Sequence, residues 1–318
     1  MGKIMSKISQ KKKSEIISSI LLLAVFVLPV LVLAGQDKKI YVDAEASGAE
    51  DGSNAHPYKT IGKALDKSDD DTEIHIAAGV YKENIEIPKG VEIYGSDRED
   101  VIIQGKNDDK PVVEMKNKTK INKVTIKKGK HGIKVKEDSK VSIIKCVIKD
   151  NDKDGIRISG GKADKKKEVS ITNSVIKNNG RTGIFSETRR IVIMDNEVID
   201  NESDGIDLAA GTSAWIQGNT IKNNDGSGMK LTLDSSNIWT KNNTYYGNER
   251  EGVEVNGFGK VGRIDLNKSK FYKNERYGVA RVQRGNFSAS IWNGFTVQSN
   301  SKYWLNKIGD LSRIIRIF

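Results

Sequence analysis

Residues 198–229 read VIDNESDGIDLAAGTSAWIQGNTIKNNDGSGM, and this stretch contains the same short motif twice. An Asn is followed four positions later by Gly and then by an apolar residue, at Asn201 and Gly205 and again at Asn224 and Gly228. Successive copies are 22 to 28 residues apart, and their Asn residues are Asn151, Asn179, Asn201, Asn224, Asn248 and Asn274. A repeat of this length with several β-type runs is typical of a solenoid or a propeller.

Apolar residues recur at fixed distances from each Asn. They lie ten and eight positions before it, as at Ile191 and Ile193, and three positions before it, as at Val198. After the Gly the alternation resumes, as at Ile206 and Leu208. Period-two alternation predicts half-buried strands. Three short strands in roughly 24 residues leave no room for a helix and are too few for a propeller blade. The sequence therefore predicts an all-β fold, a parallel β-helix.

The Asn and Gly columns are interpreted as turn chemistry, not as a binding site. Gly would supply a positive φ in the turn that leads into a strand, and Asn tolerates the same region. A second polar column lies five positions before the repeating Asn and includes Asn196, Asn219 and Asn243. Three consecutive Asn in register predict a ladder of side-chain amides.

The first 34 residues have the composition of an export signal. Residues 1–15 contain five Lys and one acid, and 16–34 are almost entirely apolar and end in Val32-Leu33-Ala34. This pattern predicts a signal peptide cleaved after about Ala34, or an uncleaved signal anchor. Either reading makes the protein secreted or extracytoplasmic. Residues 35–318 are expected to form one β-helix domain, with an N-terminal cap at 36–72, coils at 73–300 and a C-terminal cap at 301–318.

Four short motifs open the predicted domain: YVD at 41–43, PYKTI at 57–61, AGVY at 78–81 and IYG at 93–95. This series resembles the start of right-handed parallel β-helix proteins of the pectate-lyase-like superfamily, in a subgroup described as a domain of unknown function. The resemblance covers about residues 39–307 and implies a right-handed parallel β-helix. It implies no particular activity, because this scaffold serves lyases, hydrolases, epimerases and non-catalytic surface proteins.

Helical caps are predicted at both ends. Residues 57–65 form an apolar face with Ile61, Ala64 and Leu65, which is expected to be a short helix covering the first coil. At the other end, apolar residues recur at 3–4 spacing: Trp304, Leu305, Ile308, Leu311, Ile314, Ile315 and Phe318. This spacing predicts an amphipathic helix that acts as a second cap, or a helix on a membrane surface, since it also contains basic residues.

A catalytic site is sought along the strands that follow each Gly. There Asp207, Lys230 and Glu254 face outward on consecutive coils, and Arg157 lies in the same column. The two carboxylates would be about 10 Å apart, close to the separation in an inverting glycosidase. The competing interpretation is an exposed ladder of alternating charges. No catalytic motif is complete and no metal site or cofactor is predicted, although calcium is left open for a lyase.

Aromatic residues form a second candidate site. Trp215 and Trp239 are expected to face outward one coil apart, and Tyr246 and Tyr272 form a similar pair. Exposed aromatic residues in a row are unusual, and flat rings pack against sugar faces. The competing interpretations are that the rings stack on each other or that loops cover them.

The net charge of +11, or +7 without residues 1–34, favours an acidic partner, such as an anionic glycan or lipid surface. The competing interpretation is an ordinary solvated surface. Lys residues are expected to be scattered along the turns, and nucleic acid is excluded because aromatic and basic residues do not interleave. We therefore expect an exported or cell-surface protein that binds a polysaccharide or cell-surface glycan or is structural. The alternatives are a polysaccharide lyase or glycoside hydrolase acting on an acidic polysaccharide, and an adhesin-like scaffold without a small ligand. A membrane would be contacted only through an uncleaved N-terminal segment.

Overall fold

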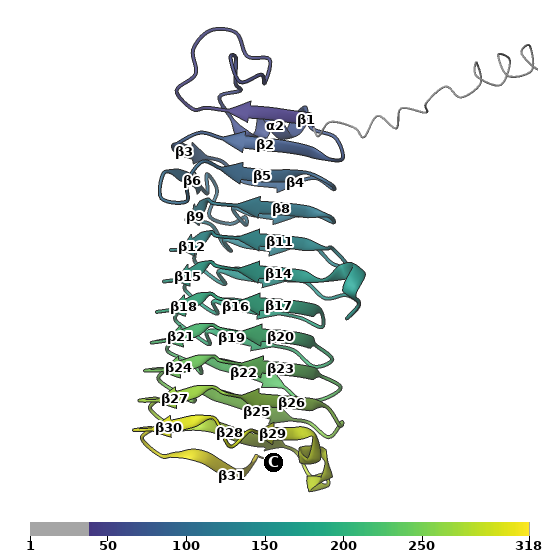
Figure 1. The fold of residues 1–318 in the computed structure, drawn as a ribbon, viewed down its shortest axis with the longest axis vertical. Coiled ribbons are helices and arrows are strands. Elements are labelled where there is room, and N and C mark those ends of the chain that lie inside the picture. The colour runs from purple at the N-terminus through teal and green to yellow at the C-terminus, as the bar shows by residue number, and fades with distance from the viewer. Residues whose placement is uncertain (1–37, 318) are drawn as a thin grey trace, which may run out of the picture. The chain divides into compact units, whose positions relative to one another are not determined.

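The computed structural model describes residues 38–317, and the predicted signal segment at 1–34 lies outside them. From Lys39 onward the chain is one compact unit, built as a stack of β-coils (Figure 1). None of the helices in the described region is long and apolar enough to cross a membrane. The predicted parallel β-helix is confirmed.

Three parallel sheets run along the stack. Sheet A contains β1 (Lys38–Val42), β2 (Thr72–Ile76), β5 (Glu92–Gly95), β8 (Thr119–Asn122), β11 (Val141–Ile144), β14 (Val169–Thr172), β17 (Arg190–Met194), β20 (Ser213–Gln217), β23 (Asn237–Lys241), β26 (Arg263–Asn267) and β29 (Phe295–Val297). Sheet B contains β3 (Gly79–Lys82), β6 (Val101–Gln104), β9 (Thr125–Lys127), β12 (Val147–Lys149), β15 (Val175–Lys177), β18 (Glu197–Ile199), β21 (Thr220–Lys222), β24 (Thr244–Tyr246), β27 (Lys270–Tyr272) and β30 (Lys302–Trp304). Sheet C contains β4 (Ile85–Ile87), β7 (Val113–Met115), β10 (Ile133–Val135), β13 (Ile156–Ile158), β16 (Ile184–Ser186), β19 (Ile206–Leu208), β22 (Met229–Thr232), β25 (Val253–Gly257), β28 (Tyr277–Arg284) and β31 (Gly309–Ile317).

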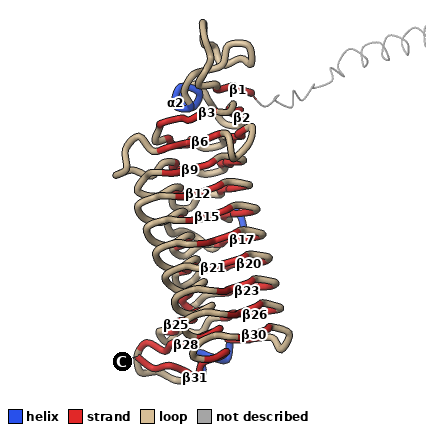
Figure 2. Tube along the Cα trace, turned by 90° about the vertical axis from the view of Figure 1, so that its left-hand side faces the viewer, coloured by secondary structure: helices blue, strands red, loops and turns tan. Residues whose placement is uncertain are grey.

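Each regular coil visits the sheets in the order A, B, C. Figure 2 shows the strands of successive coils above one another, with the turns aligned between them. Sheet A leads to sheet B through a two-residue turn, such as Asp195 and Asn196. The turn from sheet B to sheet C holds six residues in the regular coils, as at 200–205. The connection from sheet C back to sheet A varies in length and includes the short helix η1 (Lys165–Lys167).

The core is a set of apolar columns that run through the coils. Ile171, Ile193 and Ile216 are paired in register in sheet A, and all three side chains are fully buried. Burying one such side chain stabilises a fold by about 1.5–3 kcal/mol, and each column repeats this contribution from coil to coil. The alternation in the sequence therefore predicted the inward-facing residues correctly in the regular coils.

The repeating Asn residues form a continuous amide ladder. In each pair the side-chain Nδ2 donates a hydrogen bond to the Oδ1 of the next Asn, for example from Asn201 to Asn224 at 2.9 Å. The members are Asn151, Asn179, Asn201, Asn224, Asn248, Asn274 and Asn306, joined at 2.9–3.0 Å. Asn224 is fully buried, so this amide is satisfied by other amides and by backbone groups. The structural interpretation of the Asn column is confirmed.

The predicted second ladder is also present. Asn196 donates from Nδ2 to Asn219 at 3.0 Å, and Asn219 donates to Asn243 at 2.9 Å. In both ladders, however, the positive φ falls on the residue before the Asn, as at Asp200 (54°) and Asp195 (55°). The Asn side chain is thus used for its hydrogen bonds, while its neighbour makes the turn.

The repeating Gly residues are required for a different reason from the one predicted. None of Gly155, Gly183, Gly205, Gly228, Gly252 and Gly278 has a positive φ. A Cβ at Gly205 would lie 2.6 Å from the carbonyl oxygen of Gly228 and 2.9 Å from Nδ2 of Asn224. Gly is needed because the amide ladder of the next coil occupies the space where a side chain would be. The expectation of positive φ at these Gly residues was wrong.

The N-terminal cap is confirmed, and the C-terminal helix is not. Helix α2 (Ile61–Asp66) buries Ile61, Ala64 and Leu65, and Glu83 accepts hydrogen bonds from the backbone N–H groups of Ile61 and Gly62 at 2.9 and 2.8 Å. Residues 302–317 instead form strands β30 and β31, preceded by the short helix η2 (Ala289–Gly294).

The 3–4 spacing of the C-terminal segment has another physical origin. Strand β31 pairs in parallel with β28, and the register shifts between Val279 and Arg281. This irregularity interrupts the period-two alternation of apolar residues in β31. The spacing of apolar residues that results resembles that of an amphipathic helix. Leu311 is paired with the inward-facing Val279 but is 45% exposed, because β31 is the last strand of sheet C among the described residues.

Replacing Gly205 with Ala tests the contact between the Gly column and the amide ladder. We expect Gly205→Ala to lower the free energy of unfolding by about 3 kcal/mol, because the added methyl group meets backbone and amide atoms that cannot move independently. Urea denaturation followed by circular dichroism measures the change. Gly309→Ala is the matched control, because its Cβ would make only an ordinary contact, 3.6 Å from Tyr277. Equal stability of the two variants would contradict the proposed role of the Gly column.

Candidate functional site

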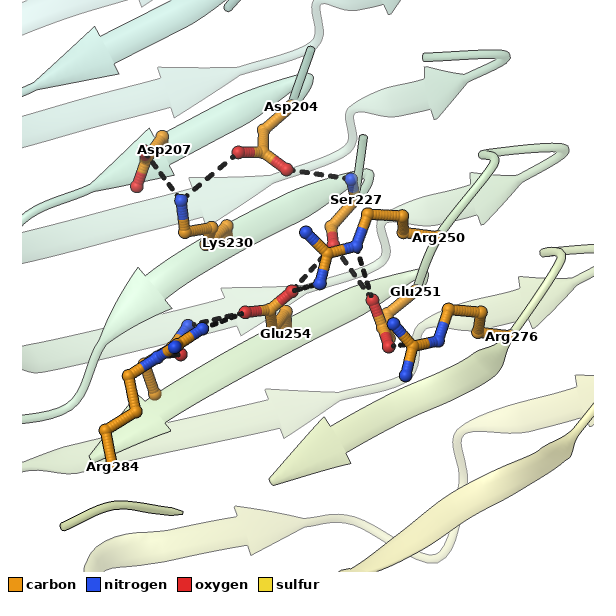
Figure 3. Close-up of polar contacts among 10 residues, drawn as sticks. Asp204, Asp207, Ser227, Lys230, Arg250, Glu251, Glu254, Arg276 and Arg284 are labelled. Atoms are coloured by element: carbon orange, nitrogen blue, oxygen red, sulfur yellow. Dashed lines mark hydrogen bonds and ion pairs between the residues drawn. The ribbon is translucent and has the colours of Figure 1, made fainter. Parts of the chain in front are cut away.

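Asp207, Lys230 and Glu254 lie side by side on sheet C. They are in register on β19, β22 and β25, with Asp207 opposite Lys230 and Lys230 opposite Glu254. The predicted neighbourhood of these three residues is therefore confirmed, and Figure 3 shows how their side chains lie.

Lys230 bridges two carboxylates. Its Nζ lies 3.4 Å from Oδ2 of Asp207 and 3.5 Å from Oδ2 of Asp204. Burial raises the pKa of both Asp204 and Asp207 above the usual value for Asp, and the charge of Lys230 offsets this only in part. Burial lowers the pKa of Lys230, but the two carboxylates outweigh it and the net direction is upward. Lys230 is thus the shared counter-ion of two partly desolvated carboxylates, Asp204 and Asp207.

Glu254 does not face solvent as the alternation predicted. Its side chain is 1% exposed, because two arginines lie over it. Arg250 approaches Oε2 to 3.0 Å and Arg284 approaches Oε1 to 3.5 Å. Asn256 also donates a hydrogen bond to Oε1, at 2.9 Å. Glu254 is therefore a buried, paired carboxylate with little access to a substrate.

Glu251 extends this cluster. It is also 1% exposed, its Oε1 lies 3.1 Å from Nε of Arg276, and burial raises its pKa. Ser227 lies between the two glutamates and donates from Oγ to Glu251 at 3.2 Å and to Glu254 at 3.3 Å. Sequence reasoning missed the arginines. The available signal was that Arg250 and Arg276 both stand two positions before a repeating Gly.

Arg157 is not brought to the other three predicted residues. Arg157 is paired in register with Phe185, and Phe185 is paired with Asp207. Phe185 therefore separates Arg157 from Asp207. The guanidinium stacks over the Phe185 ring at 4.5 Å and forms ion pairs with Asp154 and Glu187. Asp154 also lies 3.4 Å from Nδ1 of His131, and burial lowers the pKa of His131 to about 4.

The charged residues on sheet C do not gather into a metal site. Within residues 38–317 no group of three or more His, Cys, Asp and Glu residues is arranged to hold a metal ion. In the cluster described above, lysine and arginine already neutralise the carboxylates. Calcium, which the sequence left open, is not tested by these observations.

Trp215 and Trp239 lie opposite each other on the outer face of sheet A. Trp215 is 44% exposed and Trp239 is half-buried. Within the described residues the two indole rings make no stacking contact, unlike the aromatic rings on sheet B. Ser170 and Val192 precede them in the same column, so this column is uncharged before the two rings, and Asp265 follows Trp239 on the next coil.

Tyr246 and Tyr272 belong to an aromatic ladder on sheet B. Their ring centroids are 4.7 Å apart, and Trp304 continues the stack 4.2 Å beyond Tyr272. Because the rings cover one another's faces, they present mainly their edges to solvent. Trp304 was missed because its segment was expected to be helical. It stands two positions before Asn306, just as Tyr246 and Tyr272 stand two positions before Asn248 and Asn274.

Lysine residues also align on sheet B, contrary to the expectation that they are scattered. Lys127, Lys149 and Lys177 are paired directly in register on β9, β12 and β15. The column continues through Ile199 to Lys222, whose Nζ lies 5.6 Å from the centroid of the Tyr246 ring. The sequence signal was the position two before the repeating Asn, which Lys149, Lys177 and Lys222 all occupy.

Glu254→Gln tests whether this glutamate is a structural residue. We expect the free energy of unfolding to fall by about 3 kcal/mol, because the substitution removes a buried negative charge that two arginines share. Chemical denaturation measures the change, and the exposed Glu249 in the same coil gives the matched control Glu249→Gln. Unchanged stability of Glu254→Gln would contradict the structural role.

Asp204→Asn tests the pH dependence of the half-buried acids. A carboxyl whose folded pKa is raised contributes stability that is complete below its unfolded pKa, about 3.8, and is lost as the pH rises through the folded pKa. Relative to the unsubstituted protein, Asp204→Asn should therefore be more stable at pH 7 than at pH 4. Urea denaturation at both pH values measures this difference. The exposed Asp225→Asn should show none, and equal behaviour of the two variants would contradict the prediction.

Comparisons with known proteins agree on the architecture. Residues 112–261 match the family described as "Right handed beta helix region". The fold is similar to that of XylC in complex with xylose, with a TM-score of 0.61 and 12% identity over 79% of this chain and 69% of that chain. It is also similar to an alginate lyase from Paenibacillus sp. str. FPU-7, with a TM-score of 0.58 and 11% identity over 88% of this chain and 100% of that chain.

A third similar structure is the A-module of the mannuronan C-5 epimerase AlgE6 from Azotobacter vinelandii. The TM-score is 0.53, with 12% identity over 87% of this chain and 99% of that chain. No curated protein matches the sequence. At these identities the likeness establishes the fold and leaves the activity open. The repeat, the three parallel sheets and the family match together show that the chain is a right-handed parallel β-helix protein.

Proposed function

We propose that this protein is an exported, polysaccharide-binding β-helix that uses its outer faces to hold a glycan without cleaving it. The observation that carries the proposal is the pair of outward-facing rings on sheet A, the exposed Trp215 and the half-buried Trp239. One exposed apolar residue is ordinary, whereas two large rings side by side on the outer face of a sheet form a patch that favours a binding partner. Indole rings bury a large area while fixing few rotatable bonds, and their flat faces suit the C–H faces of sugars.

The surroundings of the two Trp residues support a carbohydrate partner. Along the column of sheet A, Ser170 and Val192 lead to the rings, so a sugar chain could lie across uncharged side chains. The similar structures named above include a xylose complex, an alginate lyase and an epimerase. The names of these three proteins refer to carbohydrates, which supports a carbohydrate partner in general without specifying a sugar.

The burial of Glu254 favours binding over catalysis. A general acid or base must reach the proton it transfers, and the two arginines and Asn256 enclose this carboxylate. Asp207 and Lys230 remain half-exposed, and the raised pKa of Asp207 is the observation that keeps a polysaccharide lyase or hydrolase as the second candidate. An adhesin-like scaffold without a ligand would leave the Trp pair unexplained.

The double variant Trp215→Ala/Trp239→Ala tests the proposal. In affinity gels containing a panel of neutral and acidic polysaccharides, we expect the unsubstituted protein to be retarded by at least one polymer. The double variant should bind that polymer at least about tenfold more weakly, as is common for central aromatic contacts. Phe258→Ala is the matched control, because Phe258 is 56% exposed but lies outside the sheets.

The same panel separates the two candidate functions. New reducing ends that disappear in Asp207→Asn would establish the enzyme and overturn the proposal of binding alone. Retention that is equal in the double variant and in Phe258→Ala would show that the Trp pair is not the binding surface.

A further inference from the structure

The outer face of sheet B contains a basic column that the fold itself does not require. Lys127, Lys149 and Lys177 occupy equivalent positions on three consecutive coils. Adjacent strands are about 4.8 Å apart, so the column spans about 10 Å of the sheet. Like charges directly opposite each other destabilise a sheet.

Like charges also meet in register on sheet C, where Glu86 lies opposite Glu114 and Lys134 lies opposite Arg157. Each of these runs is only two residues long, and all four residues form ion pairs. There the outward column alternates in sign from Asp207 to Lys230 to Glu254. On sheet B only Lys149 has a carboxylate near its Nζ, that of Asp150 at 3.4 Å. In the described part of the chain neither Lys127 nor Lys177 forms an ion pair. The column thus keeps unneutralised positive charge at regular intervals.

A groove runs beside the lysine column. Its volume is about 220 Å³, and its floor includes the uncharged side chains of Thr125, Val147 and Val175. Arg98 and Glu99 line the N-terminal end of the groove, where they pair with each other at 3.4 Å. Glu99 is the one carboxylate on the groove. A neutral floor with a wall of cations fits a ligand that has both apolar faces and regularly placed acidic groups.

Further along sheet B the column changes from lysine residues to aromatic residues. After Ile199 it reaches Lys222, which lies over Tyr246, and the aromatic ladder continues to Tyr272 and Trp304. The lysine residues and the aromatic rings together form a single line of side chains that follows the axis of the stack. This geometry suits an extended polymer better than a membrane, which would contact a broad, protruding surface.

We propose that the outer face of sheet B binds an acidic polysaccharide, with Lys127, Lys149 and Lys177 contacting its carboxylate groups. The lysine side chains have flexible stems and strongly hydrated charges, so they can follow a polymer without fixing a single register. This surface is separate from the Trp pair on sheet A, and neither proposal depends on the other.

The test compares polygalacturonate with its fully methyl-esterified form, which has the same backbone without the charges. We expect the protein to bind polygalacturonate more tightly, and the preference to weaken as salt screens the charges. The triple variant Lys127→Gln/Lys149→Gln/Lys177→Gln should lose about tenfold in affinity for polygalacturonate, since each exposed ion pair contributes modestly. Its affinity for the ester should not change.

Two further variants separate position from net charge. Lys165→Gln/Lys166→Gln/Lys167→Gln removes the same three charges from the connection between sheets C and A, and it should bind polygalacturonate like the unsubstituted protein. Lys127→Arg/Lys149→Arg/Lys177→Arg keeps the charge and should retain binding. Because removing like charges relieves repulsion, the glutamine variant of sheet B should fold with an unchanged or slightly higher Tm.

Three results would overturn the proposal. The first is equal binding of polygalacturonate by the sheet B variant and the unsubstituted protein. The second is an equal loss in both glutamine triples, which would mean that net charge alone attracts the polymer. The third is a sheet B glutamine variant that binds polygalacturonate normally but no longer binds vesicles of phosphatidylglycerol and phosphatidylcholine. That result would assign the column to a membrane surface.

Discussion

The close contact between each Asn side chain and the Gly of the preceding coil is the constraint on which this fold depends. The amide ladder can run through the structure only because a column of Gly leaves space for it. A buried amide without partners would be costly, whereas here each one is satisfied by its neighbours. The ladder thus fixes the register of the coils from Asn151 to Asn306, and the register places the outward-facing residues in columns.

Those columns are used differently on the three outer faces. Sheet C alternates acid and base from Asp207 to Glu254 and covers its most buried carboxylates with arginines. Sheet A is uncharged where it leads to its two tryptophans. Sheet B joins a run of like charges to a stack of aromatic rings. Since the backbone is nearly the same in all coils, the differences in surface chemistry reflect side-chain choice alone, which is how one scaffold supports many functions.

The sequence predicted what depends on periodicity. The three strands of a coil, their inward residues and the ladder through Asn196 and Asn219 follow from spacing within one repeat. It could not predict features that depend on several coils at once. Glu254 is buried by Arg250 from the preceding turn and Arg284 from the next coil. The C-terminal strand was mistaken for a helix because a register shift imitates helical spacing.

The three corners of a coil differ in how much extra chain they tolerate. From β11 to β26, the corner between sheets A and B has two residues and the next corner has six, because a ladder made mainly of Asn and Ser side chains runs through each. The third corner has only three residues between Ser186 and Arg190, but ten between Ile158 and Val169. Differences in repeat length are absorbed mainly there. New loops can therefore be added along that edge without altering the register, which makes it the natural place for insertions during evolution or in engineering.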